Sequence, residues 1–393
     1  MDGRNLPPEY LNRYSGVTSV IPKLEPTDIP KTPLSPAVPV SVKADRPKPP
    51  VFPSYDPRGW SPLTKSLSGI GILVVIIVVI VGSVLGVRAN RYPKYLPLNY
   101  RLVDRYQGTS FFDQFHYFTD DDPTDGFVVY VNERTAQSLN LTYATETSAI
   151  LRVDSLTPKA LAGRNSVRIE SKSTYDSGLF IFDIVHTPYG CGTWPALWLT
   201  DGYNWPMNGE IDILETTNEG AHGNEVTLHS TKGCKMNVKR KQTGNPVFSN
   251  CENITNSNSG CGVVGDPSTY GQAMNAEGGG VYALELRDDG VRAWFFPRGF
   301  IPGDITDPSQ IPDPSTWGTA LADFPSTECD IASHFRNQSI IVNIDLCGQL
   351  ADQPQFYEKM YNCPGRCPDF VANNPSSFEE AYWEFNNFAV YQA

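Results

Sequence analysis

The sequence predicts an all-β protein: one large β-sandwich domain, preceded by a single transmembrane helix and a disordered N-terminal tail. Two observations predict the sandwich. Strand-like runs recur from residue 126 to the end of the 393-residue chain, and 32 glycines and 33 prolines supply turns between them. A third observation, the uncharged apolar segment 66–87, predicts the helix.

Ten runs support the strand prediction, because they alternate apolar and polar residues or are short apolar runs bounded by turn residues. They span residues 126–132, 149–155, 166–172, 178–186, 195–200, 209–215, 224–230, 281–297, 339–346 and 381–392. Within one of them, "RDDGV" predicts a tight hairpin, since Asp-Gly tolerates positive φ angles. Only "PSTWGTALADF" shows a weak helical period. Many antiparallel strands over about 290 residues favour a sandwich that remains one domain.

The N-terminal part has a different composition. Residues 1–65 contain 14 prolines and no periodic pattern, so we expect a disordered cytoplasmic tail, either a spacer or a proline-motif ligand. The next 22 residues, 66–87, would form roughly 33 Å of helix, enough to cross a bilayer. A cleaved signal peptide starts near residue 1, so this segment resembles an uncleaved signal anchor. Residues 88–104 would form a stem, and residues 105–393 the folded domain.

Cysteines and glycosylation sequons predict the orientation, because basic residues flank the apolar segment on both sides. All eight cysteines lie between Cys191 and Cys367, which fits disulfides formed in an oxidising compartment. Three N-glycosylation sequons lie on the same side, at Asn140, Asn253 and Asn337. We therefore expect a single-pass type II membrane protein with residues 88–393 in the secretory lumen or outside the cell.

Charge and cysteine spacing exclude other classes. Residues 88–393 carry 22 basic and 37 acidic groups, which argues against nucleic-acid binding because that needs a basic surface. The pair in "CPGRC", Cys363 and Cys367, has no second close pair or nearby histidine to complete a zinc site. We expect no cofactor, no metal and a monomer. The spacing does not define how the eight cysteines pair.

An acidic row in "NGEIDILETTNEG" is the first candidate site. On a strand, Glu210 and Asp212 point to one face, and Ile211 and Ile213 to the other. Glu215 lies an odd step away, so it joins the acidic face only if a β-bulge between Asp212 and Glu215 absorbs one residue. The alternative is an ordinary solvated strand face with scattered charge.

The distance arithmetic favours a catalytic row. With a bulge, the two glutamates lie about four strand steps apart, roughly 13 Å between their backbones. If both side chains lean inward, roughly 5 to 6 Å separates the carboxyl groups, the spacing of a retaining glycosidase. One carboxylate would then attack the anomeric carbon while the other acts as acid and base, and Asp212 would influence which group holds the proton.

Three tryptophans precede the acids, in "CGTWPALWLTDGYNWPMNG". Sugar rings have apolar C–H faces that stack on aromatic planes, so Trp194, Trp198 and Trp205 beside paired carboxyls favour a carbohydrate site. The alternative for each tryptophan is packing in the core, and this alternative is strongest for Trp198, which lies inside the apolar run "PALWL".

These motifs resemble the fungal endo-β-1,3(4)-glucanases (laminarinases) of glycoside hydrolase family 16. The resemblance rests on "GTWPALWL", "NWPMNGEIDILE", "EVTLHS", "VNIDLCG" and "AYWEFNNFAVYQ", and it covers roughly residues 105–393. It implies a jelly-roll β-sandwich of the concanavalin A-like type, with a substrate groove on its concave sheet and a retaining mechanism. It does not cover residues 1–87, where secreted laminarinases carry a cleavable signal.

The resemblance also implies roles for individual residues. Glu210 would be the nucleophile, Asp212 its helper and Glu215 the acid/base. Substrate-binding residues would be Trp194, Trp198, Trp205, His229 in "VTLHS" and Arg168 in "VRIESK". A purely structural role remains an alternative for His229 and for Arg168.

Three functions remain in view. The first is an endo-acting hydrolase of β-1,3 or mixed β-1,3/1,4 glucan that acts on the cell wall. The second is a β-glucan transglycosylase, in which a sugar hydroxyl instead of water intercepts the same intermediate. The third is a glucan-binding membrane protein without activity, which would have no need of both glutamates.

Overall fold

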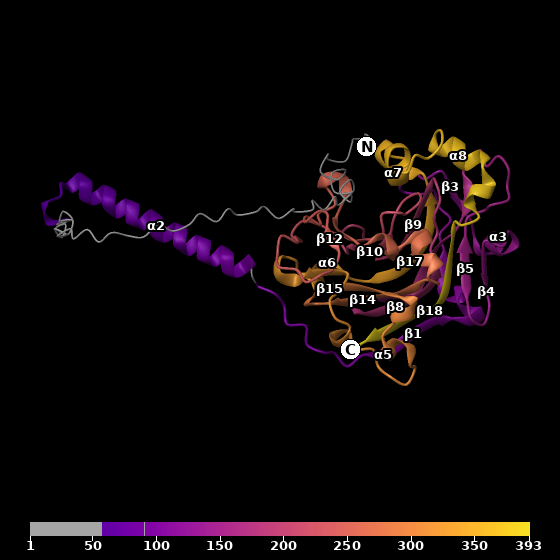
Figure 1. Ribbon diagram of the computed structural model, residues 1–393, viewed down its shortest axis with the longest axis horizontal. Helices are drawn as coiled ribbons and strands as arrows, with labels where there is room; N and C mark the ends of the chain where they lie inside the picture. The colour runs from indigo at the N-terminus through magenta and orange to yellow at the C-terminus, as the bar shows by residue number, and fades with distance from the viewer. Residues whose placement is uncertain (1–56, 90) are drawn as a thin grey trace, which may run out of the picture. The chain divides into compact units, whose positions relative to one another are not determined.

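The computed structural model describes residues 57–89 and 91–393, so the tail predicted for residues 1–65 lies outside the described residues as far as residue 56. Its last part, 57–65, contains a 3-10 turn at Pro57–Gly59 and the start of a helix. The chain separates into a helical unit that ends at Val87 and a β domain that begins at Arg88 (Figure 1). Helix α2 (Pro62–Ala89) lies in the helical unit except for its last two residues, and it includes the predicted segment 66–87. Its segment Pro62–Val87 contains an 18-residue window with a mean hydropathy of 3.2, and the segment is long and apolar enough to cross a membrane.

Two eight-stranded antiparallel sheets form the β domain. The strands of sheet A are β1 (Arg101–Gln107), β4 (Thr142–Ala144), β5 (Ala149–Arg152), β8 (Gly178–His186), β14 (Gly280–Arg287), β15 (Gly290–Pro297), β16 (Ala322–Pro325) and β18 (Tyr382–Gln392). They run in the order β16-β15-β14-β8-β18-β5-β4, and β1 also pairs with β18.

Sheet B carries the acidic row. Its strands are β2 (Phe115–Tyr117), β7 (Arg168–Tyr175), β9 (Thr193–Thr200), β10 (Glu210–Glu215), β11 (Glu225–His229), β12 (Asn245–Pro246), β13 (Cys261–Val264) and β17 (Gln338–Leu346). They run in the order β12-β13-β11-β10-β9-β17-β7-β2. A separate parallel pair joins β3 (Val128–Tyr130) and β6 (Arg164–Ser166). The predicted all-β sandwich is therefore confirmed.

Short helices occupy the connections of the β domain. They are α3 (Glu133–Ser138), α4 (Gly271–Ala276), α5 (Gly303–Thr306), α6 (Ile331–His334), α7 (Gly348–Ala351) and α8 (Cys367–Asn373), with a π-helical turn at Gln355–Met360. Figure 1 shows α7 and α8 together at one end of the sandwich. This C-terminal excursion between β17 and β18 borders the start of β9, because Cys347 N–H donates to the carbonyl of Gly192.

The main core lies between the two sheets. Phe180 and Phe182 of β8 in sheet A belong to the same buried cluster as Leu197 and Leu199 of β9 in sheet B. Burial of each such side chain stabilises the folded state by about 1.5–3 kcal/mol. The alternating residues of β9 and β10 point away from this core, so the outer face of sheet B is free for polar residues.

Sheet A is covered on its outer face as well. Leu179 and Ile181, which alternate with the core phenylalanines, pack in a second cluster with Trp294 and Trp317. The loop that carries Trp317 crosses this face, and its indole Nε1 donates to both carboxylate oxygens of Asp304. This cover occupies the outer face of sheet A around β8, β14 and β15.

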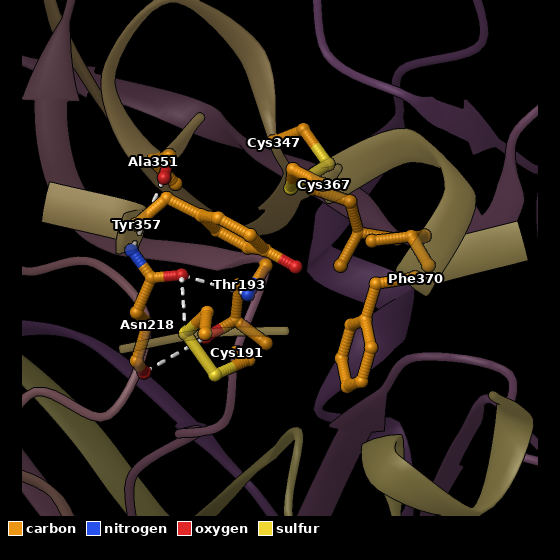
Figure 2. Close-up of a disulfide and its surroundings, with 12 residues drawn as sticks. Cys191, Thr193, Asn218, Cys347, Ala351, Tyr357, Cys367 and Phe370 are labelled. Atoms are coloured by element: carbon orange, nitrogen blue, oxygen red, sulfur yellow. Dashed lines mark hydrogen bonds between the residues drawn. A yellow bond between two sulfur atoms is a disulfide. The ribbon is translucent and has the colours of Figure 1, made fainter. Parts of the chain in front are cut away.

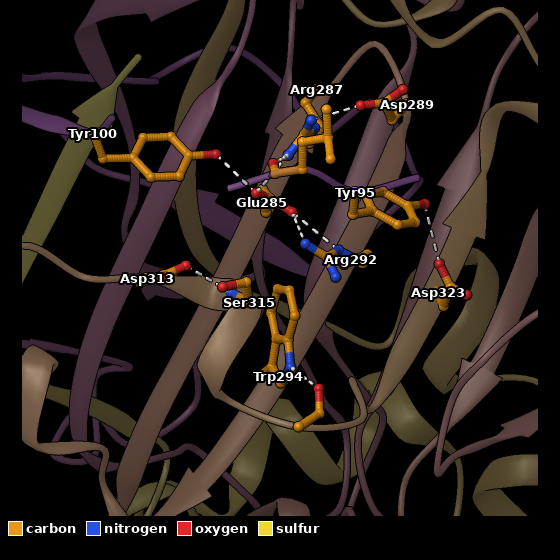
Figure 3. Close-up of polar contacts among 12 residues, drawn as sticks. Tyr95, Tyr100, Glu285, Arg287, Asp289, Arg292, Trp294, Asp313, Ser315 and Asp323 are labelled. Atoms are coloured by element: carbon orange, nitrogen blue, oxygen red, sulfur yellow. Dashed lines mark hydrogen bonds and ion pairs between the residues drawn. The ribbon is translucent and has the colours of Figure 1, made fainter. Parts of the chain in front are cut away.

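The segment before β1 is bound to the domain by tyrosines (Figure 3). Tyr100 donates a 2.9 Å hydrogen bond to Glu285, and Tyr95 donates to Asp323 at 3.3 Å. Glu285 is 1% exposed and forms an ion pair with Arg292. An unpaired carboxylate at this depth would cost several kcal/mol, and the arginine and the tyrosine supply its partners.

Four disulfides account for all eight cysteines, which confirms the predicted oxidised state. The pairs are Cys191–Cys363, Cys234–Cys329, Cys251–Cys261 and Cys347–Cys367. Figure 2 shows that two of them lie near each other where the C-terminal excursion meets the start of β9. There Asn218 accepts from the N–H of Gly192 at 2.8 Å and donates to the carbonyl of Ala351 at 3.2 Å.

Each of the ten runs predicted as strands coincides with or overlaps an observed strand. The predicted hairpin joins β14 to β15, where Arg287 pairs with Gly290 across a two-residue turn. The weak helix prediction for "PSTWGTALADF" is wrong. That segment contains a single 3-10 turn, a left-handed Gly318 with φ of +76°, and strand β16, which pairs with β15.

Candidate active site

The acidic row lies on β10 and contains the predicted β-bulge. The pairing of β10 with β11 and with β9 shifts register after Asp212. Opposite the three acids on β9 are Thr200 (Glu210), Trp198 (Asp212) and Ala196 (Glu215). These partners are two residues apart, so they share one face, and all three acids share that face with them. We call this side of sheet B the acidic face.

Local sequence explains how the strand keeps this geometry. Ile211, Ile213 and Leu214 are all fully buried in the core, so the extra residue of the bulge is absorbed on the apolar side. Gly209, directly before the row, has φ of +71°, and a Cβ there would lie 2.3 Å from the carbonyl oxygen of His334. Only glycine fits this position without displacing its neighbours.

His229 lies opposite Glu210 on β11 and closes the row on one side. Its Nε2 is 3.3 Å from Asp212 Oδ2 and 3.9 Å from Glu210 Oε1. Burial alone would lower the pKa of His229, but the hydrogen bond with Asp212 and the surrounding acids raise it to about 10. Its Nδ1 lies 3.1 Å from Oδ1 of Asn258, which holds the ring in place.

Two carboxyl groups of the row, those of Asp212 and Glu210, have raised pKa values. Burial, followed by the charges of Glu210 and Glu215, raises the pKa of Asp212 well above its usual range. Burial also raises the pKa of Glu210, against the opposing effect of His229, and the charge of Glu215 raises it further. The carboxyl groups of the row therefore influence one another's protonation, as closely spaced acids do.

Trp194 and Trp205 contact the two glutamates. The indole Nε1 of Trp194 donates a 2.8 Å hydrogen bond to Oε1 of Glu215. A side-chain hydrogen bond from Trp205 favours the charged form of Glu210. Trp205 is 40% exposed and precedes a cis proline, Pro206. Its ring is therefore accessible beside the row, as expected for a residue that stacks on a sugar.

Trp198 and Arg168 form a second group on the acidic face. Trp198 is half-buried, and its indole Nε1 donates to Oδ1 of Asn343 at 2.8 Å. The guanidinium of Arg168 lies 5.0 Å from the Trp198 ring centre and 4.4 Å from that of Phe118. It also forms a 2.7 Å ion pair with Glu170. The structure therefore brings Arg168 beside Trp198 on the face where the resemblance implied a substrate contact.

The three sequon asparagines lie away from the core. Asn140 and Asn337 are exposed and Asn253 is half-buried. Nδ2 of Asn337, the atom that would carry a glycan, donates a 2.9 Å hydrogen bond to Asp201. Asp201 also accepts from side chains in the loop that carries Trp205.

One group of ligand atoms on the acidic face could hold a metal ion. Atoms of Glu210, Asp212 and His229 all lie within 4.8 Å of one another. Two carboxylates and an imidazole are a donor set suited to zinc or manganese. The same atoms belong to the acidic row, and the mechanism below uses them as acids and bases.

Sequence reasoning did not assign several residues of this face. Asn343 and Asp345 alternate along β17 opposite Ala196 and Trp194, and Glu170 lies across from Ile341. Asn343 bridges Trp198 and the hydroxyl of Tyr130. The alternation in "VNIDL" could have identified Asn343 and Asp345, because both polar residues fall on the same strand face.

The β-sandwich carries an acidic row in which each glutamate accepts a hydrogen bond from a tryptophan. These features define an enzyme of the β-sandwich glycoside hydrolase class. Comparison with known proteins agrees. The model of the family described as "XgeA-like, catalytic GH16 domain" matches residues 115–391. A probable glycosidase of Schizosaccharomyces pombe is 46% identical over 308 residues, which cover 77% of this chain and 72% of the relative. The chain belongs to glycoside hydrolase family 16, and it is a glycoside hydrolase.

Other relatives carry more specific names. An endo-1,3(4)-beta-glucanase of Arthroderma benhamiae is 41% identical over 304 residues, which cover 75% of this chain and 65% of that protein. Laminarinase 16A from Phanerochaete chrysosporium, solved with two β-glucans in its donor and acceptor sites, is 43% identical with a TM-score of 0.72. An elongating β-1,3-glucosyltransferase of family 16 is 38% identical with a TM-score of 0.69. Each structural match covers 75% of this chain, and 99% and 100% of the two neighbours.

Proposed function

We propose that this protein is a retaining endo-β-glucanase that hydrolyses β-1,3 or mixed β-1,3/1,4 glucan through a covalent glycosyl-enzyme intermediate. The bulge in β10 is the observation that carries the proposal, because it brings Glu210 and Glu215 to one face of sheet B. The similarity to laminarinases and to proteins named endo-1,3(4)-beta-glucanase supports the substrate class.

The mechanism assigns one step to each carboxyl. Glu210 attacks the anomeric carbon as a carboxylate, and Glu215 gives its proton to the departing glycosidic oxygen. In the second half, Glu215 takes a proton from water while water releases the sugar from Glu210. Asp212 and His229 lie within hydrogen-bonding range of each other beside Glu210, and a protonated pair there limits the negative charge around the nucleophile.

The direct test replaces each glutamate in turn. We expect Glu210→Gln and Glu215→Gln each to reduce oligosaccharide release from laminarin by about 10²–10⁴-fold, the usual contribution of an acid or base group. Both substitutions keep the side-chain shape, so thermal unfolding temperatures should remain close to wild type. Glu170→Gln, an acid on the same face outside the row, should retain turnover within about tenfold of wild type. Activity of either row variant near wild type would contradict the mechanism.

Transglycosylation is the second candidate, favoured by the similarity to the elongating β-1,3-glucosyltransferase. It uses the same intermediate, and a sugar hydroxyl replaces water as the acceptor. Product analysis on laminarin, with and without an added oligosaccharide acceptor, separates the outcomes. Shorter products alone indicate hydrolysis and longer products indicate transfer. Binding without any product would indicate a glucan-binding protein instead.

We further propose that α2 anchors the enzyme as a single-pass type II membrane protein, with the β domain in the secretory lumen or cell exterior. The apolar length of α2 and the four disulfides of the β domain support this orientation. A tethered β-glucanase fits remodelling of the cell's own wall glucan better than digestion of distant polymer.

A further inference from the structure

Trp194 makes a contact that sugar stacking does not require. Its indole Nε1 donates to Oε1 of Glu215 at 2.8 Å. Strand pairing produces this contact, because Glu215 lies opposite Ala196, two residues from Trp194 on β9. The two side chains are therefore diagonal neighbours on the acidic face. The only hydrogen that the indole nitrogen can donate is directed at Glu215.

The ring of Trp194 is surrounded by closely packed groups. Asp345 lies opposite Trp194 on β17 and is 2% exposed. A Cβ on Gly348 would lie 3.2 Å from Cζ3 of Trp194 and 3.1 Å from Oδ2 of Asp345. A Cβ on Gly126 would lie 2.0 Å from Oδ1 of Asp345. Both glycines therefore leave the space that the carboxyl and the ring occupy.

The buried carboxyl group of Asp345 lies close to a second carboxyl group, that of Asp122. The hydroxyl of Thr124 lies 2.6 Å from Oδ2 of Asp122 and 3.0 Å from Oδ2 of Asp345, yet it has one hydrogen to give. Asp122 also accepts from two backbone N–H groups. Burial, followed by the charge of Asp122, raises the pKa of Asp345 well above its usual range.

We propose that Trp194 is a positioning residue that determines which oxygen of Glu215 carries the catalytic proton. This rests on the proposed role of Glu215 as acid/base. An indole N–H can only donate, so Oε1 must accept, and the proton of the neutral acid is placed on Oε2. In the first half-reaction the proton passes from Oε2 to the glycosidic oxygen as its bond to C1 breaks and Glu210 bonds to C1.

The reverse transfer uses the same oxygen. Oε2 takes a proton from water as the water oxygen bonds to C1 and the bond from C1 to Glu210 breaks. Oε1 keeps its hydrogen bond with the indole N–H through both steps, since a carbonyl oxygen and a carboxylate oxygen can each accept this hydrogen.

The test uses two substrates that differ in their need for an acid, with the full-length protein in detergent. Laminarin needs protonation of its leaving oxygen, whereas a 2,4-dinitrophenyl β-laminaribioside releases a stable phenolate without it. We expect Trp194→Phe to lower kcat/KM on laminarin by about tenfold or more and on the aryl glycoside by less than about threefold. Glu215→Gln should give the same pattern with a larger loss on laminarin.

Two further variants keep the test decisive. Benzothienylalanine at position 194 has the shape of tryptophan with sulfur in place of N–H, so it should fold normally and reproduce the pattern of the phenylalanine variant. Trp198→Phe removes an indole N–H that bonds to Asn343, so its losses should be similar on both substrates. Equal losses on both substrates for the two position-194 variants, or no loss, would overturn the proposal. A wild-type protein inactive on both substrates would instead refute the proposed function.

Discussion

At the scale of single residues, the acidic row depends on the charge of His229. This side chain is 8% exposed and faces Glu210, Asp212 and Glu215, which together raise its pKa to about 10 despite its burial. A buried imidazolium next to several carboxyls offsets their negative charge on the acidic face. The sequence motif identified this histidine, but its protonation follows only from how β11 aligns with β10.

Stability should therefore depend on pH through His229. Its folded pKa is raised above the ordinary value of about 6.5, so between pH 6.5 and about 10 the folded state binds a proton that the unfolded state has released. The free energy of unfolding should decrease as pH rises through this window. We expect His229→Gln to make this decrease shallower, measured by denaturant titration of tryptophan fluorescence at pH 7, 8.5 and 10.

A second buried histidine provides the control. His186 is 7% exposed, and burial lowers its pKa despite the opposing contact with Glu380. Its folded and unfolded forms are both neutral above pH 7, so His186→Gln should not alter the slope in this range. An unchanged slope in the His229 variant would show that the imidazole is neutral in the folded protein.

At the scale of elements, the bulge in β10 determines the site. The odd spacing between Asp212 and Glu215 was sufficient to predict it, because one extra residue is the smallest change that restores parity. The ten strand runs were also predictable from local alternation. The pairing of β9 with β17, which brings Asn343 to Trp198, joins residues 145 positions apart, and no local pattern encodes such a contact.

A pair of deletions tests the bulge. Deleting Ile213 leaves Glu-Ile-Asp-Leu-Glu, a regular alternation that keeps all three acids on the acidic face. Deleting Ile211 leaves Glu-Asp-Ile-Leu-Glu, in which the first two acids point to opposite faces. Each deletion removes one fully buried isoleucine, at a cost of about 2–5 kcal/mol, so the pair is matched for lost packing.

We expect the protein without Ile213 to retain at least about tenfold more activity on laminarin than the protein without Ile211. Circular dichroism and thermal unfolding of both variants show whether each retains the sandwich. Equal activity in the two folded variants would mean that the parity of the row does not control the chemistry.

At the scale of the whole molecule, two units with different chemistry share one chain. The helical unit is apolar and uncharged from residue 66 to 87, whereas the β domain is acidic and carries four disulfides. The sequence predicted disulfides because every cysteine lies in one region, but the pairs depend on the fold. Cys191 and Cys363, which are 172 residues apart, meet only when the C-terminal excursion reaches the start of β9.

This organisation leads to a prediction about topology. If α2 is a signal anchor, the β domain enters the secretory lumen, and its exposed sequons meet the glycosylation machinery. The protein made with microsomes should therefore shift to higher mobility on gels after endoglycosidase treatment, and Asn140→Gln should remove one glycan. Asn256→Gln changes an exposed asparagine outside any sequon and should leave the pattern intact.

In sealed microsomes, protease should remove an N-terminal epitope tag and spare the β domain. A protected tag with a digested β domain would reverse the proposed orientation.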